Sequence, residues 1–160
     1  TSIAGPIDNL FIDRRVDVVR TTVIDNNAVL TEWQAPDIIS ELIAQYSIYR
    51  STDSIDYILH TTVPASVHEY VDHEVDVNDK NYYYKVEAIN ICDVPVNLGN
   101  QGSSILLNAE LMENVSILNW TPYKGWDTGV DYYIIEKLND RGEWKLIKAV
   151  DGKTTHFEDD

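Results

Sequence analysis

The residues best suited to chemistry are the carboxylates of the run DHEVDVND, which places Asp72, Glu74, Asp76 and Asp79 close together in the chain. Calcium binds where several oxygen ligands converge to replace its water shell, so this spacing is compatible with a calcium site. The run lacks the central glycine and the final glutamate of an EF-hand loop. A metal site at these four side chains is therefore a hypothesis that depends on how the chain folds around them.

A second candidate site is the aromatic pair in the segment PYKGWDTG, which contains Tyr123 and Trp126. Two aromatic side chains exposed on a loop can stack on a sugar ring, so the pair is a candidate binding site for polysaccharide. The alternative is that Trp126 folds back onto the protein and serves packing instead. The sequence leaves both interpretations open.

No set of residues predicts catalysis or a bound cofactor. None of the histidines stands in an HExxH or HxH arrangement or near a G-x-S-x-G elbow. The segment NLGNQGSS lacks the lysine of a phosphate-binding loop. Cys92 is the only cysteine, which excludes an internal disulfide, a zinc site with several cysteines and a CxxC redox pair. We therefore expect a protein that is not an enzyme and holds no cofactor.

The charge of the chain excludes further classes of partner. The 160 residues carry a formal net charge of -15, which repels nucleic-acid phosphates and anionic lipid head groups. No apolar run approaches the length of a membrane span. We expect neither nucleic-acid binding nor membrane insertion.

The elements that would position the candidate sites read as β-strands throughout. Short apolar runs bounded by Asn, Asp, Gly and Pro predict an all-β sandwich. The turn DNN, residues 25–27, predicts a hairpin because Asn and Asp tolerate left-handed backbone. One amphipathic helical turn is expected at IISELI, residues 38–43. The predicted strands are Val16 to Ile24, Ala28 to Gln34, Gln45 to Arg50, Tyr57 to Val63, Tyr82 to Asn90 and Ser103 to Leu111.

The chain contains an internal repeat. When the sequence is shifted by 87 residues against itself, it aligns without a gap from Asn27 to His73, and Trp33 falls on Trp120. Identity is low, which indicates a shared fold and not a shared binding function. The other matches are Tyr46 with Tyr133, Ile48 with Ile135, Asp53 with Asp140, Tyr57 with Trp144, Leu59 with Leu146, Val63 with Val150, Tyr70 with Phe157 and Asp72 with Asp159.

These motifs resemble the fibronectin type III domain. The first copy has AVLTEWQAP, YSIYRSTD and YVDHEVDVNDKNYYYKVEAIN, and the second has SILNWTP, YYIIEKLND and HFEDD. YSIYRSTD and LNWTPYKGW also resemble tandem modules in large secreted or surface proteins of Bacteroidetes, of the type associated with gliding and sorting. The resemblance implies a linker or domain remnant over residues 1–15, a first domain over 16–105 and the N-terminal part of a second over 106–160.

The resemblance also implies which side chains form the two cores. In a sandwich, alternate residues of a strand face the core, so Tyr82, Tyr84 and Val86 point inward while Tyr83 stays outside. Tyr82 takes the place of a tyrosine corner, whose hydroxyl bonds to backbone a few residues upstream. The acidic run then reads as a strand that enters a loop. The remaining core residues are expected to be Trp33, Tyr46 and Ile48 in the first copy and Trp120, Tyr133 and Ile135 in the second.

The second copy matches the first only as far as the residue corresponding to His73, so counterparts of the last two strands are missing. We expect other domains of the same parent chain, or another protein, to supply them. The leading functional hypothesis is a non-catalytic extracellular or cell-surface spacer or adhesion module within a larger protein. The alternative is a carbohydrate-binding accessory module of a secreted hydrolase, with Tyr123 and Trp126 contacting the polysaccharide. A small hydrolase that uses the acidic loop is a third hypothesis.

Overall fold

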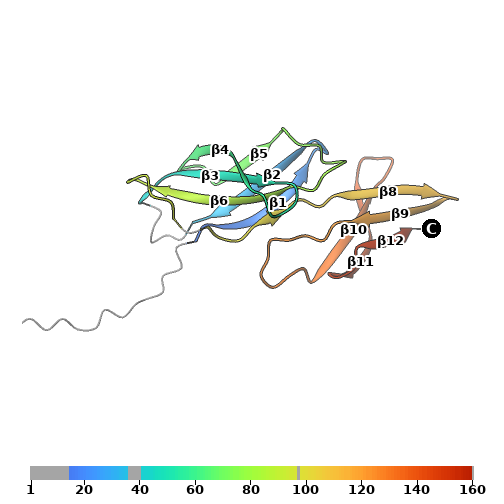
Figure 1. Cartoon of the computed structure of the whole chain (residues 1–160). Helices are drawn as coiled ribbons and strands as arrows, with labels where there is room; N and C mark the ends of the chain where they lie inside the picture. The colour runs from blue at the N-terminus through green and yellow to red at the C-terminus, as the bar shows by residue number, and fades with distance from the viewer. Residues whose placement is uncertain (1–14, 36–40, 97, 160) are drawn as a thin grey trace, which may run out of the picture.

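The computed structural model describes residues 15–35, 41–96 and 98–159, and its regular elements are all β-strands. Strands β1 to β7 form a first module and strands β8 to β12 form a second, and the two lie end to end (Figure 1). Among the described residues, no helix is long and apolar enough to cross a membrane.

The first module is a sandwich of two antiparallel sheets. One sheet has three strands in the order β1-β2-β5, and the other has four in the order β4-β3-β6-β7. This arrangement confirms the predicted immunoglobulin-like, fibronectin type III-like fold. The strands are β1 (Asp17–Ile24), β2 (Ala28–Gln34), β3 (Ile43–Ser51), β4 (Ile58–Pro64), β5 (Glu69–Asp72), β6 (Tyr83–Asn90) and β7 (Gly102–Ser103).

The core of the first module lies between these sheets and follows the alternation of each strand. Trp33 of β2 meets Tyr46 of β3 edge to face, with ring centroids 5.4 Å apart. Tyr84 and Val86 of β6 are fully buried, while Tyr83 is half-buried. The core residues are Val16, Val18, Val29, Trp33, Ala35, Ile43, Tyr46, Ile48, Val77, Tyr82, Tyr84, Val86 and Ala88.

Two local predictions are confirmed. Asp25 and Asn26 have positive φ angles of 50° and 54°, as a tight hairpin between β1 and β2 requires. The hydroxyl of Tyr82 accepts a hydrogen bond of 2.9 Å from the backbone N–H of Asp76, which is the tyrosine corner. That bond satisfies the polar end of a ring that is otherwise buried.

The second module repeats this plan as far as β12, and within residues 98–159 no counterparts of β6 and β7 follow. One sheet has the order β12-β9-β8, and β10 pairs with β11 in a separate two-stranded sheet. A β-bulge falls between Ile48 and Tyr49 of β3 and, at the repeat-related place, between Ile135 and Glu136 of β10. The strands are β8 (Leu107–Met112), β9 (Val115–Trp120), β10 (Tyr132–Leu138), β11 (Trp144–Asp151) and β12 (His156–Asp159).

One expectation about elements is wrong, and a second is contradicted at the end that the structure describes. The single strand from Ser103 to Leu111 is two strands, because β7 ends the first module's sheet at Ser103 and β8 begins the second's at Leu107. The helical turn over residues 38–43 lies partly outside the described residues. Its described end is not helical, since Ile43 begins β3 and pairs with Asn90 of β6.

Candidate functional site

The acidic run does not gather its carboxylates around one point. Within residues 15–35, 41–96 and 98–159, no three His, Cys, Asp or Glu side chains are grouped so that they could hold a metal ion. Asp72 is the buried member, with no exposed surface, whereas Glu74 and Asp79 are exposed. The backbone N–H of Asp76 donates to the Tyr82 hydroxyl, so this residue serves the tyrosine corner.

Asp72 is instead the centre of a polar network in which hydrogen bonds link strands β3, β5 and β6 and a close contact reaches β4. Its Oδ2 accepts 2.8 Å hydrogen bonds from Arg50 Nη1 of β3 and from the Tyr84 hydroxyl of β6. His60 Nε2 of β4 lies 3.4 Å from the same oxygen. The other oxygen, Oδ1, accepts the backbone N–H of Glu74 at 2.9 Å. Donors occupy both oxygens, which suits a buried carboxylate that holds strands together.

The electrostatics of the network follow from burial and charge. Burial by itself raises the pKa of Asp72, but hydrogen bonds from Arg50 and Tyr84 outweigh it and bring the pKa below the ordinary value. Burial, and then the Asp72 charge, strongly raise the pKa of the Tyr84 phenol. The aspartate therefore stays ionised and the tyrosine stays a hydrogen-bond donor at neutral pH.

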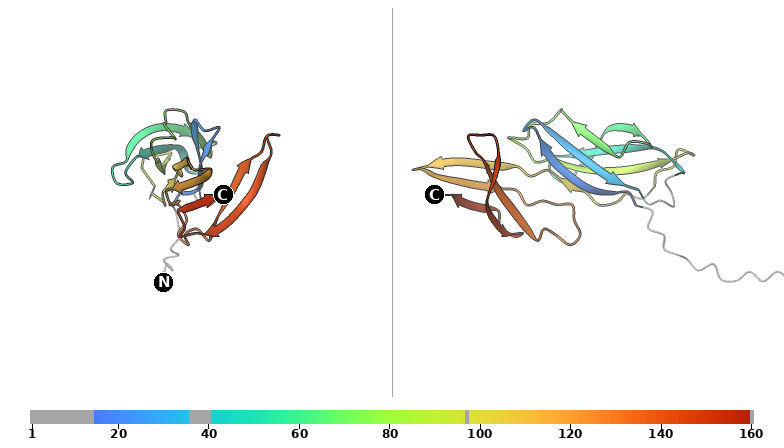
Figure 2. Two further views of the ribbon diagram at one scale, coloured as in Figure 1. Left: turned by 90° about the vertical axis from the view of Figure 1, so that its right-hand side faces the viewer. Right: turned by 180° about the vertical axis from the view of Figure 1, so that it is seen from behind.

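The aromatic pair lies against the first module. The rings of Tyr123 and Trp126 are 4.8 Å apart at an interplanar angle of 50°. Trp126 is 51% exposed, and its Nε1–H donates a 3.1 Å hydrogen bond to the carbonyl oxygen of Val19 in β1. The loop between β9 and β10 thus folds back toward β1, as the right-hand view of Figure 2 shows.

Further hydrogen bonds hold this loop in place. Asn100 Nδ2 donates to the carbonyl oxygens of Val18 at 2.9 Å and Gly125 at 2.6 Å, so one side chain bridges the modules. The backbone N–H of Lys124 donates to Ser103 Oγ at 2.7 Å. Gly125 has no room for a side chain, because a Cβ atom there would lie 2.7 Å from the Tyr123 hydroxyl oxygen. We call this set of contacts the junction.

Beside the junction lies an open cavity of about 350 Å³ between the modules. Its lining includes Arg20 and Thr22 of β1 and the exposed ring of Tyr132 together with Tyr123 and Trp126. Burial raises the pKa of the Tyr123 phenol. The cavity combines aromatic rings with a cationic and a hydroxyl side chain, which are the groups that commonly contact sugars.

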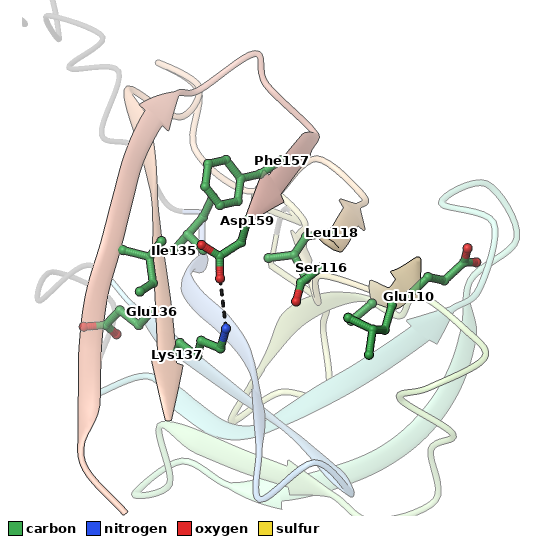
Figure 3. Close-up of a pocket in the computed structure, with 11 residues that line it drawn as sticks. Glu110, Ser116, Leu118, Ile135, Glu136, Lys137, Phe157 and Asp159 are labelled. Carbon is green, nitrogen blue, oxygen red and sulfur yellow. Dashed lines mark hydrogen bonds and ion pairs between the residues drawn. The ribbon is translucent and has the colours of Figure 1, made fainter. Parts of the chain in front are cut away.

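The expected core residues of the second module lie together but are less covered than those of the first. Trp120 meets Tyr133 with ring centroids 5.6 Å apart and an interplanar angle of 70°, close to the 69° of Trp33 and Tyr46. Trp120, Tyr133 and Ile135 are all half-buried. Ile135 lines an open groove of about 320 Å³ between β10 and the sheet formed by β8, β9 and β12 (Figure 3).

Sequence reasoning missed Arg50, Asn100 and Lys137. Arg50 and Lys137 are related by the repeat shift of 87 residues. Each pairs with an aspartate at the end of a strand in the other sheet of its module: Arg50 with Asp72 of β5, and Lys137 with Asp159 of β12. Both copies of the repeat therefore carry a basic residue at this position, and that match could have pointed to the two ion pairs. No sequence pattern points to Asn100, because Val18 and Gly125, which it contacts, lie far away in the sequence.

No family model and no curated protein matches the sequence. Among solved structures, the chain is similar to a two-domain fibronectin type III segment of chicken tenascin, with 17% identity, a TM-score of 0.41 and coverage of 91% of this chain and 80% of that one. It is also similar to the FN1–FN3 domains of chicken CNTN1, with 11% identity, a TM-score of 0.44 and coverage of 91% and 56%.

Over a shorter stretch, the chain is similar to a β-1,2-glucanase from Parabacteroides distasonis, with 24% identity and a TM-score of 0.47. That match covers 56% of this chain and 12% of the glucanase, so the chain spans a small part of that protein. The class of this chain, tandem fibronectin type III-like sandwiches, is defined by its strand order and by the contacts that the two modules share.

Proposed function

We propose that the chain is a non-catalytic spacer and adhesion segment of a larger secreted or cell-surface protein. The observation that carries the proposal is the junction. A spacer must hold its ends at a set separation, and hydrogen bonds from Asn100 and Trp126 fix the second module against β1. The resemblance of the sequence to modules of Bacteroidetes surface proteins supports the extracellular setting.

The test is whether the two modules move as one body. Residual dipolar couplings measured by NMR should fit a single alignment tensor for both modules of the unaltered chain. Asn100→Ala removes the side chain that bridges Val18 and Gly125, and should give two tensors while each module stays folded. Two independent tensors in the unaltered chain would overturn the spacer proposal.

The second candidate function is carbohydrate binding, which the half-exposed Trp126 beside the cavity with Tyr132 favours. Glycan-array binding that Trp126→Ala abolishes would support an accessory module of a secreted hydrolase. Asn100→Ala is the matched control, because it loosens the junction and leaves the aromatic rings intact. If the chain binds no glycan, the carbohydrate-binding function is rejected and the spacer function remains.

A further inference from the structure

Strands β4 and β11 are the outer strands of two related sheets. β4 pairs with β3 and β11 pairs with β10, and no described strand pairs with the opposite edge of either one. In the first module, β6 and β7 lie on the far side of β3 and leave β4 uncovered. The free edge of β4, and of its repeat counterpart β11, therefore follows from this sheet order. Such an edge carries N–H and C=O groups that can pair with another strand.

The β4 edge lacks the features that usually protect a free edge. Residues 58–63 include no Lys, Arg, Asp or Glu, and the strand has a proline only at its last position. Charged side chains and prolines within an edge strand normally discourage pairing with other chains. Ile58 and Leu59 are 65% and 56% exposed, and Ile55 just before the strand is 78% exposed. β4 thus presents an uncharged, apolar edge to solvent.

The β11 edge is apolar as well, but it is basic. Trp144 and Leu146 are 67% and 59% exposed. Leu146 is the repeat counterpart of Leu59 and is exposed to nearly the same degree, so both modules present an apolar side chain at this position. β11 also carries Lys145 and Lys148, and its only carboxylate is at its last position. The ribbon formed by β10 and β11 projects to one side of the molecule in the left-hand view of Figure 2.

Charge distinguishes the three pairings that these edges permit between two copies of the chain. Two β11 edges would bring lysines against lysines, and like charges across neighbouring strands are destabilising. Two β4 edges would bring together two first modules, residues 16–105, in which Asp and Glu outnumber Lys and Arg by more than three to one. Asp53 and Asp56 lie between β3 and β4. A β11 edge on a β4 edge instead places the lysines beside the acidic module.

The net charge of -15 on each copy does not prevent this contact. At physiological salt, charges more than about 8 Å apart are largely screened, so the groups close to the contact dominate the electrostatic energy. Those groups have opposite signs when β11 meets β4, and the same sign in the other two pairings.

We propose that the β11 edge of one copy adds to the β4 edge of a second copy, so that the two sheets become one. Trp144 and Leu146 of one copy lie beside Ile58 and Leu59 of the other, and the lysines of β11 face the acidic first module. The two surfaces differ, so the contact is head-to-tail and leaves one free edge at each end, and copies join into open chains. The proposal goes beyond the spacer function and does not depend on it, because neither edge belongs to the junction.

The test is sedimentation velocity of the full chain at rising concentration, with variants that disable one edge each. The unaltered chain should associate beyond the dimer, half of it at about 0.1 mM, since one strand on each side makes a small contact. Leu59→Asp in β4 and Leu146→Asp in β11 each put a charge into the contact and should weaken self-association at least about tenfold. Ile91→Asp, at a 66% exposed isoleucine after β6, is the matched control and should associate as the unaltered chain does.

Mixing the two edge variants separates the proposal from its alternatives. Leu59→Asp keeps an intact β11 and Leu146→Asp keeps an intact β4, so an equal mixture should form a one-to-one pair and nothing longer. Pairing of β4 with β4 would leave Leu146→Asp associating, and pairing of β11 with β11 would leave Leu59→Asp associating. Either result overturns the proposal, as does a mixture that stays monomeric or an unaltered chain that is monomeric at about 1 mM.

A second measurement keeps the test valid if an edge variant unfolds its module. Lys145→Glu combined with Lys148→Glu changes only exposed side chains and should weaken association at least about tenfold, because β11 then meets an acidic module with like charge. In the unaltered chain, amide hydrogen exchange should slow along β4 and β11 as the concentration rises. It should stay unchanged along β5, the outer strand of the three-stranded sheet. Equal slowing of β5, or association that the lysine changes leave intact, would contradict the proposal.

Discussion

The two modules place the same residue types at the same points of the same strands, yet cover them to different degrees. Tyr46 and Ile48 of β3 are 1% and 0% exposed, whereas Tyr133 and Ile135 of β10 are only half-buried. Both pairs face the opposite sheet, as the alternation of a strand requires. Local sequence therefore determines which face of the strand a side chain takes. How far that side chain is buried depends on β6, a strand more than thirty positions later in the first module.

The same contrast applies to the ion pairs. Arg50 with Asp72 and Lys137 with Asp159 join equivalent strands. The Asp72 side chain is 0% exposed and that of Asp159 is 24% exposed, while the Lys137 side chain is 62% exposed. Removing one partner of a buried pair leaves an uncompensated charge, whereas solvent screens a surface pair.

The largest expected effect is a difference in the stability lost when each of these two aspartates is replaced by alanine. Asp72→Ala should destabilise the first module by about 3 to 5 kcal/mol, because Arg50 and Tyr84 lose their acceptor. Asp159→Ala should cost the second module less than about 1 kcal/mol. Urea unfolding with amide exchange read separately in each module measures both. Equal losses would remove the contrast between a buried and a solvated pair.

A second prediction compares the two isoleucines. Ile48→Ala should destabilise the first module by about 2 to 5 kcal/mol, because it leaves a cavity in a closed core. Ile135→Ala should cost roughly half as much or less, since this side chain already borders an open groove. The measurement is the shift of each urea midpoint. A larger loss at Ile135 would mean that the groove is closed in solution.

The third prediction concerns acid. The pKa of Asp72 is lower in the folded chain than its ordinary 3.8, so its contribution to stability is complete above that value and is lost as the pH falls through the folded pKa. The first module should therefore lose stability below about pH 4. Asp72→Asn should flatten this dependence. Urea midpoints measured from pH 6 down to about pH 2 test it, and a variant whose midpoint falls as steeply as the unaltered chain's would assign the acid loss to other carboxylates.

Much of the fold could be predicted because its signals are local. The DNN turn sets the hairpin between two neighbouring strands, and the Tyr82 hydroxyl bonds to the backbone only six residues upstream, at Asp76. Each of these features involves residues that are close together in the sequence. The break inside the predicted strand from Ser103 to Leu111 was missed, because only three residues separate β7 from β8 and none of them is a Gly or Pro that would mark the change. The hydrophobic pattern runs through both strands although they belong to different sheets.

The sites could not be predicted as well, because their partners are distant in sequence. Asp72 resembles a calcium ligand within its own run, and only β3 and β6 reveal the donors that occupy it. Trp126 and Val19 are 107 positions apart, so no periodicity relates them. Sequence left open whether Trp126 is exposed or folded back, and the structure shows that one side chain does both: half of it is exposed while its indole N–H bonds to the first module.

The smallest effect is expected from Trp126→Phe. This variant tests whether the open edge of the second module depends on the junction. Trp126→Phe removes the hydrogen bond to Val19 and keeps an aromatic ring beside Tyr123, so stability should fall by about 1 kcal/mol or less. The modules should move more independently, while amide exchange along β10 stays as fast as in the unaltered chain. If the exchange of β10 slows, the junction itself holds the groove open, and the difference between β3 and β10 would then come from contact between the modules as well as from the absence of a strand like β6.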